Sequence, residues 1–98
     1  MPAYFIAEVE VRDPVAFKAY ADQVAATAEE YGGRYIVRGG TAHAIEGEAP
    51  KRFVISVWDT ADDAKRWYSS PEYSKIIGIR HRTCNTRAFI VEGIAATP

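Results

Sequence analysis

The sequence predicts an α+β domain in which helices cover one face of a four-stranded antiparallel sheet. Three observations lead to this expectation: short runs rich in β-branched and aromatic residues, segments with apolar residues at helical spacing between them, and glycine or proline at the junctions. The length of 98 residues is typical of one domain. We therefore expect a single domain over residues 1–98.

The first half of the chain is predicted to form a strand, a helix and a second strand. YFIAEVEV, residues 4–11, is apolar with partial alternation, which indicates a strand. Asp13 is a favourable N-cap, and Pro14 suits the first helical position. Apolar residues then recur at helical spacing at Phe17, Tyr20, Ala21, Val24, Ala28 and Tyr31. Gly32 is predicted to end this helix, and residues 34–38 (RYIVR) are predicted to form the next strand.

The two glycine doublets of YGGRYIVRGG, residues 31–40, do not indicate a phosphate-binding loop. Such a loop connects a strand to the helix that follows it, and it carries Gly-Lys-Ser/Thr. Here Gly32 and Gly33 follow a helix instead. We expect Gly39 and Gly40 to bulge or bend a strand that resumes over residues 41–46.

The second half repeats the pattern with a strand, two helical segments and a last strand. RFVISVW, residues 52–58, is predicted to be a strand, and Thr60 with Asp63 approximates a capping box. Ala64, Trp67 and Tyr68 are predicted to face inward from the first helical segment. Ser70-Pro71 ends that segment and begins the next one. The second segment carries its stripe at Tyr73, Ile77, Arg80 and Cys84. With a last strand at residues 86–92, the order is βαββαβ, the ferredoxin-like arrangement.

The strands carry apolar residues on both faces of the predicted sheet. In the first strand Phe5, Ala7, Val9 and Val11 share one face, and Tyr4, Ile6, Glu8 and Glu10 share the other. We expect the face without helices to carry Tyr4, Ile6, Val54, Trp58 and Ile90. A monomer would expose this patch, which marks an interface or a ligand groove. We predict a homodimer that packs sheet against sheet, with Glu8 and Ser56 among the enclosed polar groups.

Composition argues against several classes of protein. The net charge is −1 with acidic and basic residues interspersed, so we expect neither nucleic acid nor an anionic membrane as a partner. The N-terminal segment lacks the features of a signal peptide, and no apolar run approaches ~20 residues, so the expected location is cytoplasmic. Cys84 is the only cysteine, which excludes an intrachain disulfide. His43 and His81 show no paired-ligand spacing, and we expect no metal, haem or other cofactor.

Five segments follow one another along the chain: YFIAEVEVRDPVAFKAY, YGGRYIVRGG, EGEAPKRFVISVWDT, RWYSSPEYSKIIGIR and FIVEG. Together they resemble the DUF1330 family of small bacterial proteins of unknown function. The resemblance covers nearly the whole chain. It implies a dimeric α/β barrel built from two ferredoxin-like subunits, and it implies no established activity. Related barrel families include cofactor-free monooxygenases, lactone isomerases and haem-degrading enzymes, which is an analogy at the level of the fold.

Five polar residues are candidates for a ligand site. Arg80 shares a helical stripe with apolar residues, and a buried guanidinium needs a carboxylate, a phosphate or several carbonyl groups. The alternatives are that Arg80 extends to the rim or pairs with Glu72 or another structural carboxylate. Glu8 would act as a base or anchor, or pair with an arginine. Arg38 shares its parity with Ile36 and has the alternative of a solubilising charge on an edge strand. Ser56 and Tyr73 complete the set of Glu8, Arg38, Ser56, Tyr73 and Arg80.

Two functional hypotheses follow from these residues. In the first, a pocket in the barrel binds a small organic molecule, and one version of this hypothesis is an acid held by Arg80. The same pocket would support proton-transfer or cofactor-free oxygen chemistry. In the second, the protein is a dimeric binding module without catalysis, and its polar residues pair with one another. A thiol nucleophile is not favoured, because His81 and Cys84 lie on different stripes. Whether an enclosed space holds unpaired donors distinguishes the two hypotheses.

Overall fold

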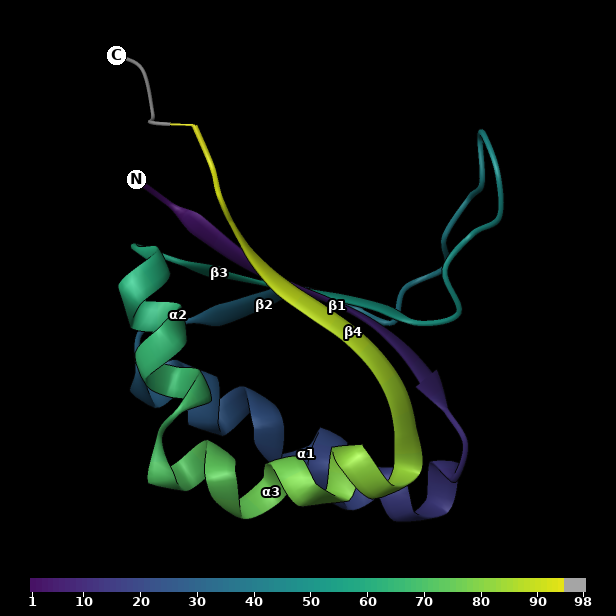
Figure 1. Ribbon diagram of the computed structural model, residues 1–98, viewed down its shortest axis with the longest axis horizontal. Helices are drawn as coiled ribbons and strands as arrows, with labels where there is room; N and C mark the ends of the chain where they lie inside the picture. Colours follow the sequence, from purple (N-terminus) through teal and green to yellow (C-terminus); the bar gives the residue numbers. More distant parts are fainter. Residues whose placement is uncertain (95–98) are drawn as a thin grey trace.

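Helices and strands follow the order β-α-β-β-α-α-β along the chain (Figure 1). The structure is a computed structural model, and it describes residues 1–94. The elements are β1 (Ala3–Val11), α1 (Pro14–Glu30), β2 (Arg34–Arg38), β3 (Phe53–Trp58), α2 (Ala61–Tyr68), α3 (Pro71–Thr83) and β4 (Cys84–Glu92). The predicted order of strands and helices is thus confirmed, and β4 begins two residues earlier than the expected Thr86.

The strands form one antiparallel sheet in the order β2-β3-β1-β4, so β1 is a central strand between β3 and β4. The three helices lie on one face of this sheet (Figure 1). This order and the helices on one side define the ferredoxin-like fold that the sequence predicts. Among residues 1–94, no helix combines the length and the apolar character that crossing a membrane requires.

Local capping signals in the sequence correctly predict where the helices begin. The side chain of Asp13 accepts a hydrogen bond from the backbone N–H of Ala16 at 3.1 Å, and Ser70 accepts one from Tyr73 at 3.1 Å. Thr60 caps α2 in the same way. Gly32 follows α1 with φ of 91°, a left-handed conformation that glycine adopts without steric cost. The Ser70 cap fixes the break between α2 and α3.

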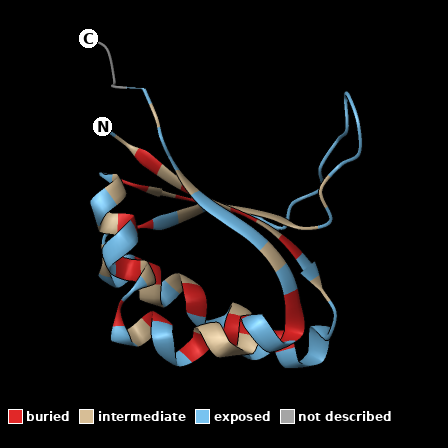
Figure 2. Cartoon of the chain, viewed as in Figure 1, coloured by how far each residue is buried: buried red, intermediate tan, exposed pale blue. Residues whose placement is uncertain are grey.

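The expected strand at residues 41–46 is absent, and that prediction is wrong. β2 ends at Arg38, Gly39 turns away with φ of 74°, and residues 39–49 are all exposed in a long loop (Figures 1 and 2). The physical reason is that residues 41–46 have no strand to pair with in the described part of the chain. The neighbouring strand β3 begins only at Phe53, and its residues already pair with those of β2. The irregularity in β2 instead lies between Tyr35 and Val37.

The expected faces of β3 and β4 are also wrong. Ser56 and Ile90 lie opposite Phe5 on the two neighbouring strands, and directly opposed residues share a face. Since Phe5 is buried under the helices, Val54, Ser56, Trp58 and Ile90 lie on the helix side, not on the open face. The open face instead carries Tyr4, Ile6, Val37, Phe53, Ile55, Val57, Phe89 and Val91. FVISVW is apolar at both parities, so its pattern did not distinguish the faces.

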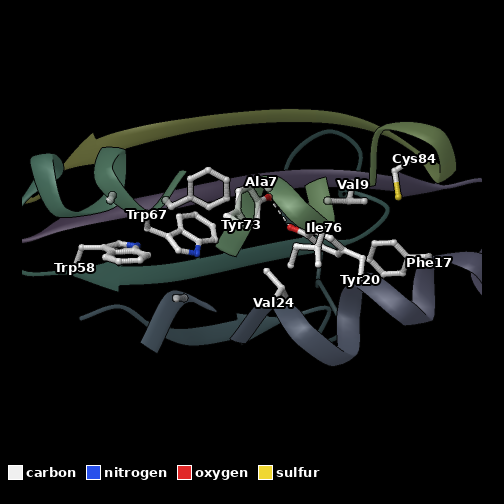
Figure 3. Close-up of a cluster of buried hydrophobic side chains, with 13 residues drawn as sticks. Ala7, Val9, Phe17, Tyr20, Val24, Trp58, Trp67, Tyr73, Ile76 and Cys84 are labelled. Carbon is white, nitrogen blue, oxygen red and sulfur yellow. Dashed lines mark hydrogen bonds between the residues drawn. The ribbon is translucent and has the colours of Figure 1, made fainter. Parts of the chain in front are cut away.

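Aromatic side chains fill much of the space between the sheet and the helices (Figure 3). Trp67 is fully buried, and its ring centroid lies 4.3 Å from that of Tyr73 and 5.2 Å from that of Trp58. Phe5 packs edge-on against Trp67 at 5.2 Å. These aromatic rings pack against one another in the core, at the separations typical of buried aromatic pairs.

The buried stripe of α3 differs in part from the prediction. Its buried residues are Tyr73, Ile76, Arg80 and Thr83. Ile77 is only half-buried, and Cys84 belongs to β4, where it lies opposite Val11. The spacing of three and four residues keeps Tyr73 and Arg80 on one face of the helix, which is directed to the core.

Candidate functional site

Arg80 is a charged side chain buried within the domain. It is 4% exposed, because its position two turns after Tyr73 directs it to the covered face of α3. The guanidinium donates from Nη1 to the hydroxyl of Tyr73 at 2.9 Å and from Nη2 to the hydroxyl of Tyr68 at 3.0 Å. Its two hydrogen-bonded partners are therefore neutral groups.

The charge of Arg80 has no acidic partner within the described part of the chain. The ion pairs found within residues 1–94 involve other cations, and the Nε atom of Arg80 is buried without a hydrogen-bond partner there. Glu72, the expected acid, instead accepts a hydrogen bond from Tyr31 at 2.8 Å. A buried cation without a counter-charge is costly, and an anionic ligand would offset that cost.

A second tyrosine extends the cluster toward α1. The hydroxyls of Tyr73 and Tyr20 lie 2.7 Å apart, as the dashed line in Figure 3 marks. Burial raises the pKa of Tyr73, and Tyr20 raises it further, while Arg80 acts in the opposite direction. Burial also raises the pKa of Tyr20. Both side chains therefore stay neutral at physiological pH, and they act as hydrogen-bonding groups rather than as bases.

Arg80 remains charged in this environment. Burial acts against its charged form, but interactions with the tyrosines, first Tyr73 and then Tyr20, favour that form, so the pKa of Arg80 is raised overall. The site thus combines a fixed positive charge with neutral hydroxyls. Such a combination binds anions and stabilises negative charge on an oxygen atom.

On one side, Arg80 borders an open pocket of about 450 Å³ between α3 and β4, which we call the groove. Its lining residues are Tyr68, Arg80, His81, Cys84, Thr86 and Ala88. The Oγ1 atom of Thr86 is buried and makes no hydrogen bond within residues 1–94. The groove therefore contains polar groups that the rest of the fold leaves unsatisfied.

On its other side, Arg80 borders a more enclosed space beneath α1, which we call the arginine cavity. Its volume is about 20 Å³, and two further arginines, Arg38 and Arg52, also line it. Tyr20 and Tyr35 contribute to its wall, together with apolar residues of the sheet and α1. Arg80 thus separates a large groove from a small cavity.

The structure brings together three of the five predicted site residues and places two elsewhere. Arg38 and Arg80 line the arginine cavity, and Tyr73 contacts Arg80 directly. Ser56 is buried and accepts a hydrogen bond from Trp58 Nε1 at 2.9 Å. Glu8 lies on the open face of the sheet, 3.7 Å from Arg87 Nε.

Sequence reasoning did not assign Tyr20, Tyr68, Arg52 and Thr86 to the site. From the sequence, Tyr20 and Tyr68 are expected to be ordinary core residues. The helical spacing of apolar residues predicts which face is buried, but it does not predict the hydrogen-bond partner of a tyrosine hydroxyl. Arg52 reads as the first residue of a strand. Its contact with Phe17, at 5.4 Å from the guanidinium carbon to the ring centroid, depends on the tertiary fold.

Neither histidine lies near a potential metal-binding cluster in the described residues. His43 lies in the exposed loop, whereas His81 borders the groove. Within residues 1–94, no three His, Cys, Asp or Glu side chains gather in a way that could hold a metal ion.

The fold and site define a ferredoxin-like α+β protein with a buried arginine that has no acidic partner within residues 1–94. The family model described as a domain of unknown function, DUF1330, matches residues 2–94, and the chain belongs to this family. No curated protein matches the sequence significantly.

Solved structures with the same fold are distant in sequence. A protein of unknown function from Rhodopseudomonas palustris has a TM-score of 0.76 at 15% identity, covering 97% of this chain and 84% of that one. SnoaB, a cofactor-independent oxygenase from Streptomyces nogalater, has a TM-score of 0.70 at 15% identity, with 99% and 97% covered. A dimeric protein of unknown function and ferredoxin-like fold from Bacteroides fragilis has a TM-score of 0.57 at 15% identity, with 94% and 96% covered. These similarities establish the fold.

Proposed function

We propose that the protein binds a small organic anion, such as a carboxylic acid, in the groove between α3 and β4. The observation that carries this proposal is the charge of Arg80, which has no acidic partner within residues 1–94. A buried guanidinium whose hydrogen bonds among the described residues go to tyrosine hydroxyls can gain its counter-charge from a ligand. The Nε atom of Arg80, which has no hydrogen-bond partner in the described part of the chain, also favours ligand binding over a purely structural role.

The size of the groove fits an organic molecule. Its volume of about 450 Å³ lies in the range of small-molecule sites, whereas the arginine cavity is far too small. The oxygen of Tyr68 accepts from Arg80, which leaves its own proton free to be donated to a ligand. Thr86 adds a hydroxyl without a partner among residues 1–94. An acid bound there would lie beside a cation and two hydroxyl groups.

The same groups are suited to chemistry on the bound molecule. An enolate is an organic anion, and Arg80 with Tyr68 would stabilise the negative oxygen that forms when a carbon acid loses a proton. His81 borders the groove, and its imidazole is a group that can accept or donate a proton. The similarity in fold to a cofactor-independent oxygenase supports proton-transfer or cofactor-free oxygen chemistry as an extension of binding.

The open face of the sheet supports a homodimer as part of this proposal. Large apolar side chains there remain partly exposed, with Phe89 45% and Val91 44% exposed. Burying such a face against a second copy removes apolar area from water. One structure of the same fold is described as dimeric, which is consistent with this arrangement. The groove lies on the opposite side, between α3 and β4, and stays accessible in such a dimer.

Native mass spectrometry on untagged protein isolated gently from its expression host tests this proposal. We expect a dimer that retains a stoichiometric small molecule of acidic character, and we expect Arg80→Met to remove that molecule while remaining dimeric. Arg82→Met is the matched control, because Arg82 is exposed on the same helix and does not border the groove. A monomer would contradict the dimer, and equal retention by Arg80→Met would contradict the role of Arg80.

A further inference from the structure

We infer that the arginine cavity is a second, separate binding site for one small monovalent anion of the size of chloride. The site lies beneath α1, where Arg38, Arg52 and Arg80 line the same enclosed space. These arginines come from the end of β2, the residue before β3, and α3. Segments far apart in the sequence thus place three arginine side chains around one small volume.

The charge of this cavity is not neutralised by the chain as described. Among its described lining residues none is acidic, and none of the ion pairs found in residues 1–94 includes Arg38, Arg52 or Arg80. Arg38 donates from Nη2 to the backbone oxygen of Ala21 at 2.9 Å. Arg52 lies over the ring of Phe17. These contacts orient the arginines without supplying a negative charge, and an anion would supply it.

The polar groups of the cavity are rich in donors. A guanidinium group has five N–H donors and no acceptor. The Nε atom of Arg52 is buried and lacks a hydrogen-bond partner within the described chain. Tyr20 and Tyr35 also line the cavity, and a tyrosine hydroxyl is a further potential donor. A water molecule would need acceptors for its own two protons, whereas a halide ion only accepts, so this lining favours the ion.

The volume determines the class of anion. The cavity volume of about 20 Å³ leaves room for about one water-sized sphere. The cavity therefore accommodates one small ion and excludes the body of an organic acid. The site is therefore distinct from the groove, although Arg80 borders both. Its occupant is the counter-ion that holds β2, β3 and α1 around the arginines.

Chloride itself is the probe for this site, with two measurements on the full chain. We expect excess ³⁵Cl NMR line broadening in the presence of the wild-type protein, and a higher melting temperature in sodium chloride than in sodium gluconate at equal ionic strength, since gluconate is too large for the cavity. Arg52→Met should lose most of both effects. Arg66→Met, which changes an exposed arginine outside the cavity, should retain them.

Further variants keep the test decisive. If Arg52→Met fails to fold, Arg38→Met takes its place, because Arg38 is exposed and its loss leaves the core intact. Thr86→Val alters only the groove and should leave both chloride effects unchanged, so failure of this inference is distinguishable from failure of the groove proposal. Absence of chloride-specific broadening in wild type, or equal broadening in Arg52→Met and Arg38→Met, would overturn the inference.

Discussion

Arg80 donates a hydrogen bond from Nη1 to the hydroxyl of Tyr73, two helical turns earlier on α3, at 2.9 Å. Both side chains are buried, and Tyr73 in turn contacts the hydroxyl of Tyr20 on α1. The contact between Tyr73 and Tyr20 links α1 to α3 beside a cation that is not balanced by any carboxylate within residues 1–94. Several measurable consequences for stability and binding follow from it.

Arg80→Met should change the free energy of unfolding by less than about 2 kcal/mol, because methionine removes a buried charge along with its hydrogen bonds. Breaking a buried ion pair costs about 3–5 kcal/mol instead, since it leaves a charge without its partner. Urea denaturation measures the difference, with Arg82→Met as the exposed control on the same helix. A loss above about 3 kcal/mol would show that Arg80 is mainly structural.

The hydroxyls of Tyr20 and Tyr73 should be energetically coupled. Each single change to phenylalanine removes one hydroxyl and leaves a buried partner, which costs about 1–3 kcal/mol. The double variant should lose less than the sum of the two, with a coupling energy of about 0.5–3 kcal/mol. A double-mutant cycle by urea denaturation measures this energy. Strictly additive losses would mean that the 2.7 Å contact contributes nothing to stability.

The contact between Tyr31 and Glu72 should make stability depend on pH. The hydrogen bond from Tyr31 lowers the pKa of the Glu72 carboxyl below its ordinary value of 4.5. Because the folded chain favours the ionised form, this contribution is complete above that value and is lost as the pH falls through the lowered pKa. Tyr31→Phe and Glu72→Gln should therefore lose less stability than wild type on acidification.

Urea midpoints at about pH 7 and at successively lower pH values below 4.5 measure this effect, since the contribution is lost as the pH falls through the lowered pKa. Glu29→Gln is the control, because Glu29 is exposed on α1. Equal acid sensitivity in wild type and both variants would refute the assigned role of the Tyr31 contact.

The glycine doublets should differ in their tolerance of a side chain. A Cβ at Gly33 would overlap the ring of Trp58, which is buried, so Gly33→Ala should cost about 1–3 kcal/mol and shift the tryptophan emission. Gly40 has open space around its Cβ position, and Gly40→Ala should leave stability unchanged or raise it by up to about 1 kcal/mol. Chemical denaturation followed by fluorescence compares the two, and similar losses would contradict the packing of Gly33 on Trp58.

Local signals predicted much of this fold. Three helices begin at side-chain caps, formed by Asp13, Thr60 and Ser70. Each capping side chain accepts a hydrogen bond from the backbone N–H three residues later, so a short window of sequence is enough to predict where the helix begins. The face of β3 was not predictable in this way. Its two rows are both apolar, and only its register against β1, which sets Ser56 opposite Phe5, decides which row is covered.

The candidate site was predictable only in part for a similar reason. The helical stripe correctly directs Tyr73 and Arg80 to the interior. Their partner Tyr20 is 53 residues from Tyr73 in the chain, and periodicity carries no information about such a pairing. The position of Arg52 depends on where the long loop returns to the sheet. Sequence patterns predict burial, whereas hydrogen-bonded clusters depend on tertiary geometry.

Titration of small carboxylates and their neutral amides into isotopically labelled protein, followed by NMR, tests the anion-binding role of Arg80 most directly. Benzoate and hexanoate are the probes, with benzamide and hexanamide as matched controls of nearly equal shape. We predict saturable shifts for the carboxylates at backbone amides of residues 80–88, and affinity at least about tenfold weaker for the amides and for Arg80→Met, as expected for a hydrogen bond to a charged group. Equal affinity of Arg80→Met for the carboxylates, equal binding of acids and amides, or no shift at these residues would contradict the account.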